Sequence, residues 1–490
     1  MNLAEIINNI KIVQVSGKAE LKDINSLSID SRKVNKDSIF FAIKGYKTDG
    51  HKYILDVLNS GVAAIVLEDN NVIPDHLFAH TGTIKILVEN TRKALADISA
   101  VFYNNPTTRL RLVGITGTKG KTTTSNFVKS VLENDKCGLI GTISIFVGDK
   151  EIESKLTTPE SHDLNALFAE MLSKKCESAV MEVSSHSLEL HRVDNLDFDF
   201  AILTNLEHDH LDFHKTVENY IDAKKKLFDG LKNEAFAIIN SDDINWQKFI
   251  TDTKAKVFTY GVNEDADFKM SNIYYSLVGT TYSIFWLGKE YLMSTPLIGS
   301  FNAYNSCAAF AVGVLAGIKP NIVVKRINDT EQVPGRFEVY NGKNKTVIID
   351  YSHTAESLQQ ALLAIKYINK ENYPVYTVFG CGGDRDKTKR PIMGEVAAKY
   401  SNFAIVTTDN PRTEKPEDII NDVVAGIKYN NYKIVVDRED AIKEAILNSE
   451  ENAIVLVAGK GHESYIEING IRTHFSDKEK VLQYLNVWKN

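Results

Sequence analysis

The sequence has 490 residues, of which 43% are hydrophobic and 25% charged, and this composition predicts an ordinary globular protein of about two to four domains. The net charge is −7 and no block of basic residues occurs, which argues against binding to nucleic acid or to an anionic membrane surface. Small anionic substrates would have to be bound by local groups of Lys and Arg.

The cysteines and the apolar segments indicate the cellular compartment in which the protein is expected to work. Cys137, Cys176, Cys307 and Cys381 lie far apart and form no CxxC pair, so neither a zinc site nor a disulfide framework is indicated. A reducing compartment is the simpler interpretation. The N-terminal segment is a poor signal peptide, and the longest apolar stretch, residues 307–318, is too short to span a bilayer. We therefore expect a cytoplasmic protein.

Strand-like runs alternate with helical stretches along the chain. In the first 108 residues such runs occur at 38–43 and 63–68, and the turn-rich cluster at 104–108 predicts a domain boundary. Apolar strands then alternate with amphipathic helices, with strands expected at 111–116, 137–142, 178–183, 200–205 and 235–240. Continuous apolar strands between helices predict a parallel sheet covered on both faces.

A second alternation follows Val333-Pro334-Gly335, with strands expected at 347–352, 376–381, 404–409, 433–437 and 453–459. It predicts a separate doubly wound domain. The expected fold class is therefore α/β with three domains and a cleft between them. They are a small α/β domain at 1–108, a central parallel-sheet domain at 109–332 and a Rossmann-like domain at 333–490.

The strongest single signal for chemistry is the segment at 111–127, RLVGITGTKGKTTTSNF. An apolar strand runs into the loop 116–122, and a helix follows. Glycines let backbone N–H groups turn toward phosphates, and the helix N-terminus adds positive potential. Lys121 would reach the β- and γ-phosphates of a nucleotide, and the Thr122 hydroxyl would bind Mg²⁺. Ile115 stands where the common GxxxxGK[ST] pattern has glycine, and a Gly-rich turn without a ligand is the alternative.

TGTKGKTT (116–123) resembles the TGTxGKT[TS] loop of the Mur ligases and of their folylpolyglutamate synthetase relatives. Further motifs of that family continue in order along nearly the whole chain. The resemblance implies a central ATPase domain in which ATP is bound by Gly117, Thr118, Lys119, Gly120, Lys121, Thr122 and Thr123.

Two further segments of the central domain imply a metal site. MEVSSH (181–186) places Glu182 near the end of a strand, and TNLEHDHLDFH (204–214) carries His208, Asp209, His210, Asp212 and His214. A polar loop is the plainer interpretation of that cluster. The resemblance implies that Glu182 and His210 bind a second Mg²⁺, although hard cations prefer oxygen ligands.

YIDAKKKLF (220–228) resembles the YxxAKxxLF segment of the family. The resemblance implies that CO₂ converts Lys224 into a carbamate, an anion able to approach Mg²⁺. From the residues alone, a solvated run of lysines on a helix is the plainer interpretation, and Lys225 and Lys226 fit it.

Other segments imply a UDP-sugar peptide as substrate. LTTPES (156–161) and SSHSLELHR (184–192) resemble family segments that hold it, which implies contacts from Thr157, Thr158, Ser184 and Arg192. Leu190 stands where a glutamine often occurs. SIDSRKV (28–34) resembles the segment near uridine, with Ile29 and Ser31 as contacts and Arg32 as an adjacent cation, whereas GYKTDG (45–50) departs from the GHQADG-like form.

Three segments imply further contacts with ATP. GSFNAYNSCAA (299–309) resembles the segment beside adenine, and Asn302 and Asn305 lie three residues apart, so both could face one side of a helix start. VPGRFE (333–338) supplies Arg336. DYSHTAES (350–357) resembles DYAHTPD, which implies roles for Asp350 and His353, while Ser352, Ala355 and Glu356 depart from it.

The last domain carries the expected amino-acid site in segments 380–391, 407–416 and 458–465. DNPR (409–412) is the form found in family members that add meso-diaminopimelate. A guanidinium meets a carboxylate through two parallel hydrogen bonds, which suits the carboxylate that lysine lacks. The residues implied are Arg385, Asp409, Asn410, Pro411, Arg412, Gly459 and Glu463. Asn-Pro is also a turn signal, and both interpretations are compatible.

The resemblance implies a monomeric, Mg²⁺- and ATP-dependent amide ligase of peptidoglycan synthesis, acting on UDP-N-acetylmuramoyl-L-alanyl-D-glutamate through an acyl phosphate. A lysine-adding ligase of the same family is the nearest alternative, and Arg412 weighs against it. Folylpolyglutamate synthetase is disfavoured by TTPES together with DNPR. A non-catalytic nucleotide-binding regulator is disfavoured by the complete set of motifs.

Overall fold

The computed structural model describes residues 1–8, 10–45, 48–132, 136–207 and 209–485. The chain folds into two compact units. The first comprises residues 1–270, 285–288 and 304–323, and the second comprises 271–284, 289–303 and the chain from 324 onward. Each unit is an α/β structure with its own hydrophobic core.

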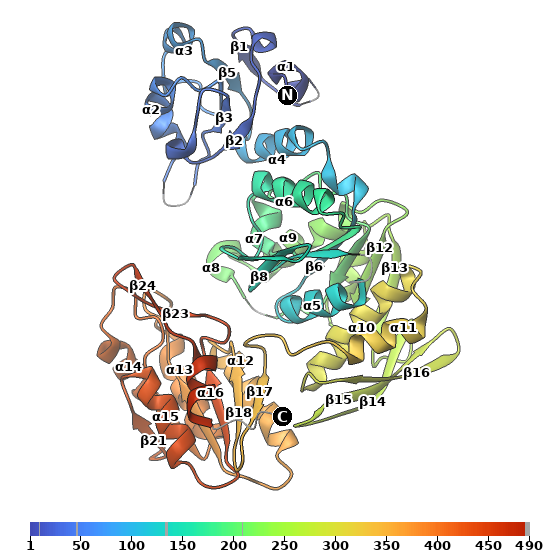
Figure 1. Cartoon of the computed structure of the whole chain (residues 1–490), viewed down its shortest axis with the longest axis vertical. Helices are drawn as coiled ribbons and strands as arrows, with labels where there is room; N and C mark the ends of the chain where they lie inside the picture. The colour runs from blue at the N-terminus through green and yellow to red at the C-terminus, as the bar shows by residue number, and fades with distance from the viewer. Residues whose placement is uncertain (9, 46–47, 133–135, 208, 486–490) are drawn as a thin grey trace. The chain divides into compact units, whose positions relative to one another are not determined.

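The N-terminal part of the first unit is a five-stranded sheet in the order β1-β5-β4-β3-β2. Strands β2 to β5 are parallel and β1 is antiparallel to β5. Helices α1 to α4 lie around this sheet (Figure 1). Alternate residues of β3 enter different cores: Phe40 packs with α2 and α3, whereas Ile39 and Phe41 pack with α1 and α4. The elements are α1 (Leu3–Ile7), β1 (Gln14–Ser16), β2 (Ser26–Ser28), β3 (Ser38–Phe41), α2 (Ile54–Asn59), β4 (Ala64–Leu67), α3 (Asp75–Thr81), β5 (Ile84–Leu87) and α4 (Thr91–Phe102).

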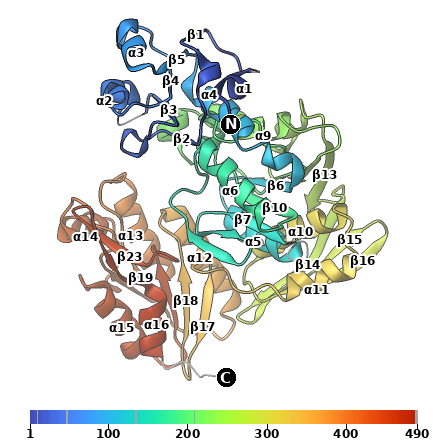
Figure 2. The ribbon, with the colours of Figure 1, turned by 45° about the horizontal axis from the view of Figure 1, so that its top comes forward.

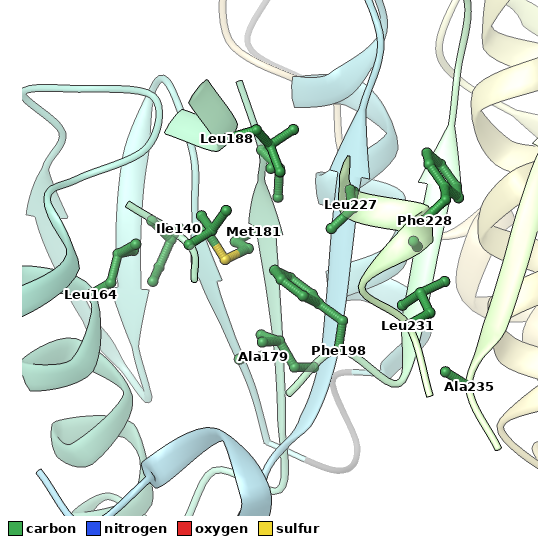
Figure 3. Packing of buried hydrophobic residues seen from close by; sticks show 14 of the residues in the cluster. Ile140, Leu164, Ala179, Met181, Leu188, Phe198, Leu227, Phe228, Leu231 and Ala235 are labelled. Carbon is green, nitrogen blue, oxygen red and sulfur yellow. The ribbon is translucent and has the colours of Figure 1, made fainter. Parts of the chain in front are cut away.

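The central part of the first unit contains a run of parallel strands in the order β13-β12-β11-β6-β10-β7, followed by β8 and β9 in antiparallel pairing. Its core packs apolar residues of the strands against α6 and α9, and Figure 3 shows Leu164 of α6, Met181 of β10 and Leu227 of α9 within it. The elements are β6 (Arg111–Thr116), α5 (Lys121–Leu132), β7 (Cys137–Ile140), β8 (Ser144–Val147), β9 (Lys150–Glu153), α6 (Ser161–Ser173), β10 (Ser178–Glu182), α7 (Ser185–Glu189), β11 (Phe200–Leu203), α8 (Leu211–His214), α9 (Val217–Asp229), β12 (Phe236–Asn240) and β13 (Lys256–Gly261).

The chain passes between the units through one run of strands and two helices. The strands β14 (Phe268–Ser276), β15 (Gly279–Trp286) and β16 (Lys289–Thr295) are neighbours in the order β16-β15-β14. The helices are α10 (Ser300–Leu315) and α11 (Pro320–Asn328).

The C-terminal part of the second unit is a six-stranded sheet in the order β17-β18-β22-β19-β20-β21, parallel except for β17. One core packs α12, α13 and α14 against it and another packs α15 and α16, so helices cover both faces (Figures 1 and 2). The elements are β17 (Glu338–Asn341), β18 (Thr346–Asp350), α12 (Ala355–Ile368), β19 (Val375–Phe379), α13 (Lys389–Tyr400), β20 (Phe403–Val406), α14 (Pro416–Val424), β21 (Tyr432–Ile434), α15 (Arg438–Asn448), β22 (Ile454–Ala458), β23 (Tyr465–Ile468), β24 (Ile471–His474) and α16 (Asp477–Leu485).

The structure confirms the expected strands of all three α/β parts, with ends that differ by at most a few residues from the predicted ranges. The parallel central sheet and the doubly wound C-terminal sheet are also confirmed. No helix in the described part of the chain has the length and apolar character that crossing a membrane requires.

Candidate functional site

The loop between β6 and α5 has the strand–loop–helix form predicted for a phosphate-binding loop. Gly117 and Gly120 have φ values of +146° and +83°, a region that side chains other than hydrogen disfavour. A Cβ at Gly117 would lie 1.9 Å from the Thr204 hydroxyl, and one at Gly120 would lie 2.6 Å from Asn305 Oδ1. Both positions therefore require glycine, because the backbone approaches neighbouring segments closely.

The segment after β11 holds this loop in place. The backbone N–H of Thr118 donates to the carbonyl of Asn205 at 2.8 Å, and that of Lys119 donates to Asn205 Oδ1 at 2.9 Å. The Thr204 hydroxyl donates to the Lys119 carbonyl at 2.7 Å. Thr204 and Asn205 were not predicted as site residues, although they begin the TNLEHDH motif.

Lys121 and Thr122, the first two residues of α5, point to different sides of the loop. Lys121 Nζ donates to the carbonyls of Gly117 and Thr118, at 2.9 Å each. The Thr122 hydroxyl donates to Glu182 Oε2 at 3.0 Å. Thr123, the next residue, is buried in the first turn of the helix.

Glu182 is fully buried at the end of β10, as the sequence predicted for the end of a strand. Besides Thr122, it accepts hydrogen bonds from Thr142, at 2.7 Å from the backbone N–H and 3.1 Å from the hydroxyl. Thr142 was not predicted. The carboxylate and the Thr122 hydroxyl form an oxygen-rich pair of the kind that Mg²⁺ prefers.

Lys224 lies on the buried face of α9 with 1% of its surface exposed. Its Nζ donates to the Gly117 carbonyl at 2.8 Å and lies 3.4 Å from the Thr116 hydroxyl. It also lies 4.7 Å from the centre of the Tyr220 ring. Burial, helped by the nearby Lys121, holds the pKa of Lys224 well below its usual range.

The lysines that follow Lys224 differ from it in environment. Lys225 forms ion pairs with Asp229, at 2.7 Å, and with Asp252, and Lys226 pairs with Glu189 at 2.6 Å. The prediction of a solvated lysine run therefore fits Lys226, whose side chain is 47% exposed, better than Lys225, whose side chain is 14% exposed. It does not fit Lys224.

His210 lies in the loop before α8, in the left-handed backbone region with φ of +54°. Its ring centre is 4.9 Å from that of His186 and 6.3 Å from that of Tyr220. Burial lowers the pKa of His210, and burial beside two further histidines lowers the pKa of His186 to about 4, so both rings are held neutral.

The rest of the His/Asp cluster is only partly described. His214 is buried, with its Nε2 2.9 Å from the Ser185 hydroxyl, and Asp209 lies 3.5 Å from His210. His208 lies outside the described residues. Across the described ranges of the chain, no three His, Cys, Asp or Glu side chains are grouped closely enough to hold a metal ion by themselves.

The predicted UDP-substrate residues of the central part form a second cluster beside Glu182. The Thr158 hydroxyl donates to the Glu182 carbonyl at 2.8 Å and accepts from the Ser184 backbone N–H at 3.1 Å. Arg192 Nη1 donates to the Thr158 carbonyl at 3.0 Å. The Thr157 hydroxyl lies 3.1 Å from that of Thr142.

Arg192 is also anchored by an acidic residue that was not predicted. Its Nη2 lies 2.8 Å from Glu160 Oε1, in the TTPES segment, and Arg92 of α4 lies 3.5 Å from the other oxygen of Glu160. This shared carboxylate fixes the orientation of Arg192.

The predicted uridine contacts lie on the N-terminal sheet. Ile29 is half-buried after β2, and Ser31 begins a short 3₁₀ helix. Arg32 binds Asp30 through two hydrogen bonds of 2.9 Å and lowers the pKa of that carboxyl to about 2. In GYKTDG, residues 46 and 47 lie outside the described residues.

The two predicted adenine-side asparagines are both buried on α10. Asn305 Oδ1 accepts from the Thr124 hydroxyl of α5 at 3.1 Å, which joins it to the phosphate loop. Asn302 Nδ2 donates to the Ile298 carbonyl at 2.9 Å, just before the helix.

The first two strands of the C-terminal domain carry the other predicted ATP contacts. Arg336 precedes β17, Asp350 ends β18, and His353 follows β18. Asp350 accepts from the Phe337 backbone N–H at 2.9 Å and from the hydroxyl of Ser352. The guanidinium of Arg336 lies 4.9 Å from the centre of the Tyr351 ring, and His353 Nδ1 lies 2.9 Å from the Tyr351 carbonyl. Ser352, a departure from the family pattern, therefore gives Asp350 an additional donor.

In the second unit, the side chains of Arg385 and Arg412 both approach Gly382. A Cβ at Gly382 would lie 2.9 Å from Arg412 Nη1 and 3.8 Å from Arg385 Cγ. Arg412 has a φ of +51°, and its backbone bonds to the hairpin strand β23, donating to Glu467 at 2.9 Å and accepting from Asn469 at 2.8 Å. A non-glycine residue in this conformation needs such support.

The other predicted amino-acid contacts surround a buried lysine that was not predicted. Lys460 is fully buried, and its Nζ lies 3.2 Å from Asn410 Oδ1, 3.3 Å from Glu463 Oε2 and 3.6 Å from Asp409 Oδ1. Asn410 Nδ2 donates to Glu463 Oε2 at 2.8 Å. Two carboxylates around one lysine leave this end of the site suited to an ammonium group.

Gly459, which precedes Lys460, has a φ of +114°, and a Cβ there would lie 2.8 Å from Asp409 Oδ2. Lys460 lies within the AGKGHESY motif, so the motif could have pointed to it. Its burial, however, depends on Asn410, about 50 residues away, and sequence periodicity cannot reveal such a partner.

Family models match three successive regions of the chain. They are "Mur ligase family, catalytic domain" at residues 23–103, "Mur ligase middle domain" at 115–313 and "Mur ligase, glutamate ligase domain" at 335–461.

Among curated proteins, the chain is 43% identical to UDP-N-acetylmuramoyl-L-alanyl-D-glutamate--2,6-diaminopimelate ligase 1 of Clostridium acetobutylicum, over 99% of both chains. Among solved structures it is similar to a UDP-N-acetylmuramoyl-L-alanyl-D-glutamate--2,6-diaminopimelate ligase, with a TM-score of 0.71 and 30% identity over 99% of both chains. It shares its fold with a MurF ligase from Thermotoga maritima in complex with ADP, with a TM-score of 0.63 and 20% identity over 94% of this chain and 97% of that one.

Proposed function

The chain belongs to the Mur ligase family, and on that premise we propose that it joins meso-2,6-diaminopimelate to UDP-N-acetylmuramoyl-L-alanyl-D-glutamate. The bond formed is an amide at the D-glutamate γ-carboxylate, made at the expense of ATP during peptidoglycan precursor synthesis. The full-length similarity to a curated ligase of this name supports the reaction. The observation that supports the choice of amino acid is the approach of two arginines, Arg385 and Arg412, to the same glycine, Gly382.

We assign one task to each predicted domain. Residues 1–108, with Ile29 and Ser31, would bind the uridine end of the UDP-substrate. Residues 109–332 would bind ATP and the peptide end of that substrate, and residues 333–490 would bind the amino acid. A cytoplasmic monomer is part of the same proposal, and the four buried free cysteines fit a reducing compartment.

The central domain supplies the groups for phosphoryl transfer. The backbone of residues 117–120 and the Lys121 ammonium would hold the β- and γ-phosphates of ATP, with Thr123 and Asn305 behind them. Phosphoryl transfer depends mainly on positioning and electrostatics, so a loop fixed by Thr204 and Asn205 suits it. Transfer of the γ-phosphoryl group to the D-glutamate carboxylate gives an acyl phosphate and ADP.

Mg²⁺ is implied by the family and fits the donors present. The Thr122 hydroxyl, 3.0 Å from the Glu182 carboxylate, would hold one ion, and Glu182 and His210, with carbamylated Lys224, would help to hold a second. When bound, the metal neutralises charge between the phosphates and the carboxylate. Burial lowers the pKa of Lys224, which favours the neutral amine, the form that adds CO₂.

The C-terminal domain would orient the amine that attacks the acyl phosphate. Arg385 and Arg412 would bind the carboxylate that lysine lacks. Gly459 and Glu463 would receive the ammonium end of the amino acid, and Asp409 and Asn410 would shape the site. Attack of the amine forms the amide and releases phosphate, and exclusion of water would protect the acyl phosphate from hydrolysis.

The test is an assay of the purified protein with UDP-N-acetylmuramoyl-L-alanyl-D-glutamate, ATP and a panel of amino acids. The measurements are the release of phosphate and the mass of the product. We expect phosphate release that requires both the UDP-substrate and meso-diaminopimelate. Preference for L-lysine would replace this function with that of the lysine-adding ligase. Activity on a folate substrate instead would reject both.

A further inference from the structure

An ion pair between a buried arginine and a half-buried glutamate joins the two segments that carry Arg385 and Arg412. Arg390 of α13 is fully buried, and both arms of its guanidinium bind Glu414. Nη1 lies 3.0 Å from Oε2 and Nη2 lies 2.8 Å from Oε1. Two parallel hydrogen bonds between a guanidinium and a carboxylate fix orientation as well as distance. Arg390, with further donors, holds the pKa of Glu414 at about 2, so the pair stays charged at neutral pH.

Each member of the pair belongs to one of the loops that carry the arginines. Arg390 lies at the start of α13, directly after the loop of Arg385, and Glu414 lies two residues after Arg412. Glu414 also reaches across to the first loop, where its Oε1 accepts from the Asp384 backbone N–H at 2.6 Å. The pair therefore joins two segments that lie more than twenty residues apart in sequence.

The two loops are in close contact beside this pair. The Gly383 backbone N–H donates to the Asn410 carbonyl at 2.9 Å, and Arg412 Nη1 donates to the Gly383 carbonyl at 2.7 Å. A Cβ at Gly383 would lie 1.9 Å from the Pro411 carbonyl. A small shift of one loop against the other would break these contacts and change the position of Arg412 relative to Arg385.

We infer that Arg390 and Glu414 form a positioning pair that sets the spacing of Arg385 and Arg412 and thereby the selectivity for a substrate with a distal carboxylate. This inference rests on the proposed function. Arg390 is too deeply buried to touch a substrate, and both oxygens of Glu414 are engaged by protein donors. The pair acts through the two arginines, so its removal should affect recognition of the distal carboxylate before anything else.

A merely structural ion pair would behave differently, because loss of stability would reduce the amount of active enzyme equally for every substrate. Selectivity between meso-diaminopimelate and L-lysine separates the two roles. Lysine has no distal carboxylate, so the spacing of Arg385 and Arg412 has little bearing on it.

The test is steady-state kinetics of the full-length enzyme with Glu414→Gln, which keeps the shape of the side chain and removes its charge. We expect KM for meso-diaminopimelate to rise roughly 10-fold while kcat changes little, as displaced substrate-binding groups would cause. KM for ATP should stay the same, and the ratio of kcat/KM for meso-diaminopimelate over lysine should fall by a similar factor. A fall in kcat alone, or equal losses for both amino acids, would overturn the inference.

Two further variants make the test independent of folding. Asp422→Asn is the matched control, because Asp422 of α14 binds the same guanidinium at 2.9 Å but lies outside both loops, and we expect its selectivity to be unchanged. Arg390→Lys keeps the buried charge but cannot form two parallel bonds, and it should reproduce the effect of Glu414→Gln even if that variant folds poorly. Altered selectivity in Asp422→Asn, or normal selectivity in Arg390→Lys, would contradict the inference.

The double variant Glu414→Gln with Arg412→Ala tests whether the pair acts through Arg412. If it does, the double variant is little worse with meso-diaminopimelate than Arg412→Ala alone, because coupled residues give non-additive effects. Fully additive losses would place the action of Glu414 elsewhere and overturn the inference. Failure of the wild-type enzyme to use meso-diaminopimelate is a separate outcome, which would reject the proposed function itself.

Discussion

The phosphate loop and the amino-acid site both gather basic side chains around glycines, but they hold those side chains differently. In the phosphate loop, Lys121 and Lys224 each donate to backbone carbonyls of residues 117–118. In the amino-acid site, Lys460 and Arg390 are held by carboxylates, those of Glu463 and Glu414 among them. One site is organised by the main chain of a contiguous motif, and the other by side chains from distant segments.

This difference suits the two expected ligands. A carbonyl oxygen orients an ammonium without cancelling its charge, so a loop of this kind can meet a multiply charged phosphate. An amino acid carries both signs of charge, and its site pairs cations with anions so that a substrate lacking one group leaves a protein charge unsatisfied. It follows that one substitution in the phosphate loop should remove one contact, whereas a substitution in the amino-acid site should disturb its neighbours.

The largest effect is expected for Lys121→Ala, which should lower phosphate release by about 100- to 1,000-fold. The fold should survive, because the carbonyls of Gly117 and Thr118 that Lys121 contacts can be hydrated instead. Phosphate release and thermal unfolding of the variant and the wild type provide the measurement. A variant that keeps more than about half of the activity would contradict the assignment of the phosphate loop.

Lys224→Ala is expected to lower activity by roughly 100-fold, and added bicarbonate should not restore it, because the amine that would become the carbamate is gone. A short carboxylic acid in solution should restore part of the activity by occupying the place of the carbamate. Carbon-13 NMR with labelled bicarbonate should show a carbamate signal in the wild type that the variant lacks. A bare ammonium at Lys224 in active, CO₂-equilibrated enzyme would reject carbamylation.

The sequence predicted those parts of the fold in which a short run of neighbouring residues determines the local structure. Strand β6, the glycines of the loop and the start of α5 follow one another directly, and apolar runs mark the buried parallel strands. No strand was predicted for residues 256–295 or 465–474, where β13–β16 and the hairpin β23–β24 lie. Their residues are largely exposed or mixed in character, so the apolar run that marks a buried strand is missing.

The residues missed in the sites have partners that lie far away in sequence. Lys460 meets Asn410, and Arg390 meets Glu414, only after the sheet has brought their segments together. Helical periodicity, by contrast, could have separated Lys224 from its neighbours. It stands four residues from both Tyr220 and Phe228, which are buried on the same face of α9, so a buried position was predictable.

Arg412→Ala tests the amino-acid site, where side chains rather than the main chain hold the basic groups. It should raise KM for meso-diaminopimelate by roughly 10- to 200-fold, for a loss of about 1.5–3 kcal/mol. KM for ATP and for the UDP-substrate should change little, since those sites use other segments. Lysine use should improve only slightly, because Arg385 would remain without its carboxylate.

Steady-state kinetics of the wild type and of Arg412→Ala with both amino acids test this prediction. Equal losses for all three substrates of the variant would mean that Arg412 does not recognise the additional carboxylate.

Lys460→Met should have a smaller effect on the same site, raising KM for meso-diaminopimelate by about 10-fold. The methionine fills the space of the lysine stem but leaves Asp409 and Glu463 without the cation between them. Arginine cannot take the place of this compact ammonium, so Lys460→Arg should not restore KM. An unchanged KM in Lys460→Met would show that the orientation of Glu463 does not depend on Lys460.

The smallest effect is expected for Lys226→Ala, two residues after Lys224 on α9. Lys226 pairs with Glu189 at 2.6 Å, and both side chains are nearly half exposed, at 47% and 46%. Exposed ion pairs of this kind contribute about 0–1 kcal/mol to stability, so activity should remain within about 2-fold of the wild type and thermal unfolding should shift little. Lys224 and Lys226 are both lysines of the same helix, but only Lys224 is buried and reaches the carbonyl of Gly117. Assayed side by side with Lys224→Ala, the variant therefore asks whether the buried amine at the loop, rather than any lysine of α9, is what the phosphate site requires. A loss as large as that of Lys224→Ala would mean that charge on α9 matters wherever it lies, and the contrast between main-chain and side-chain organisation would no longer hold.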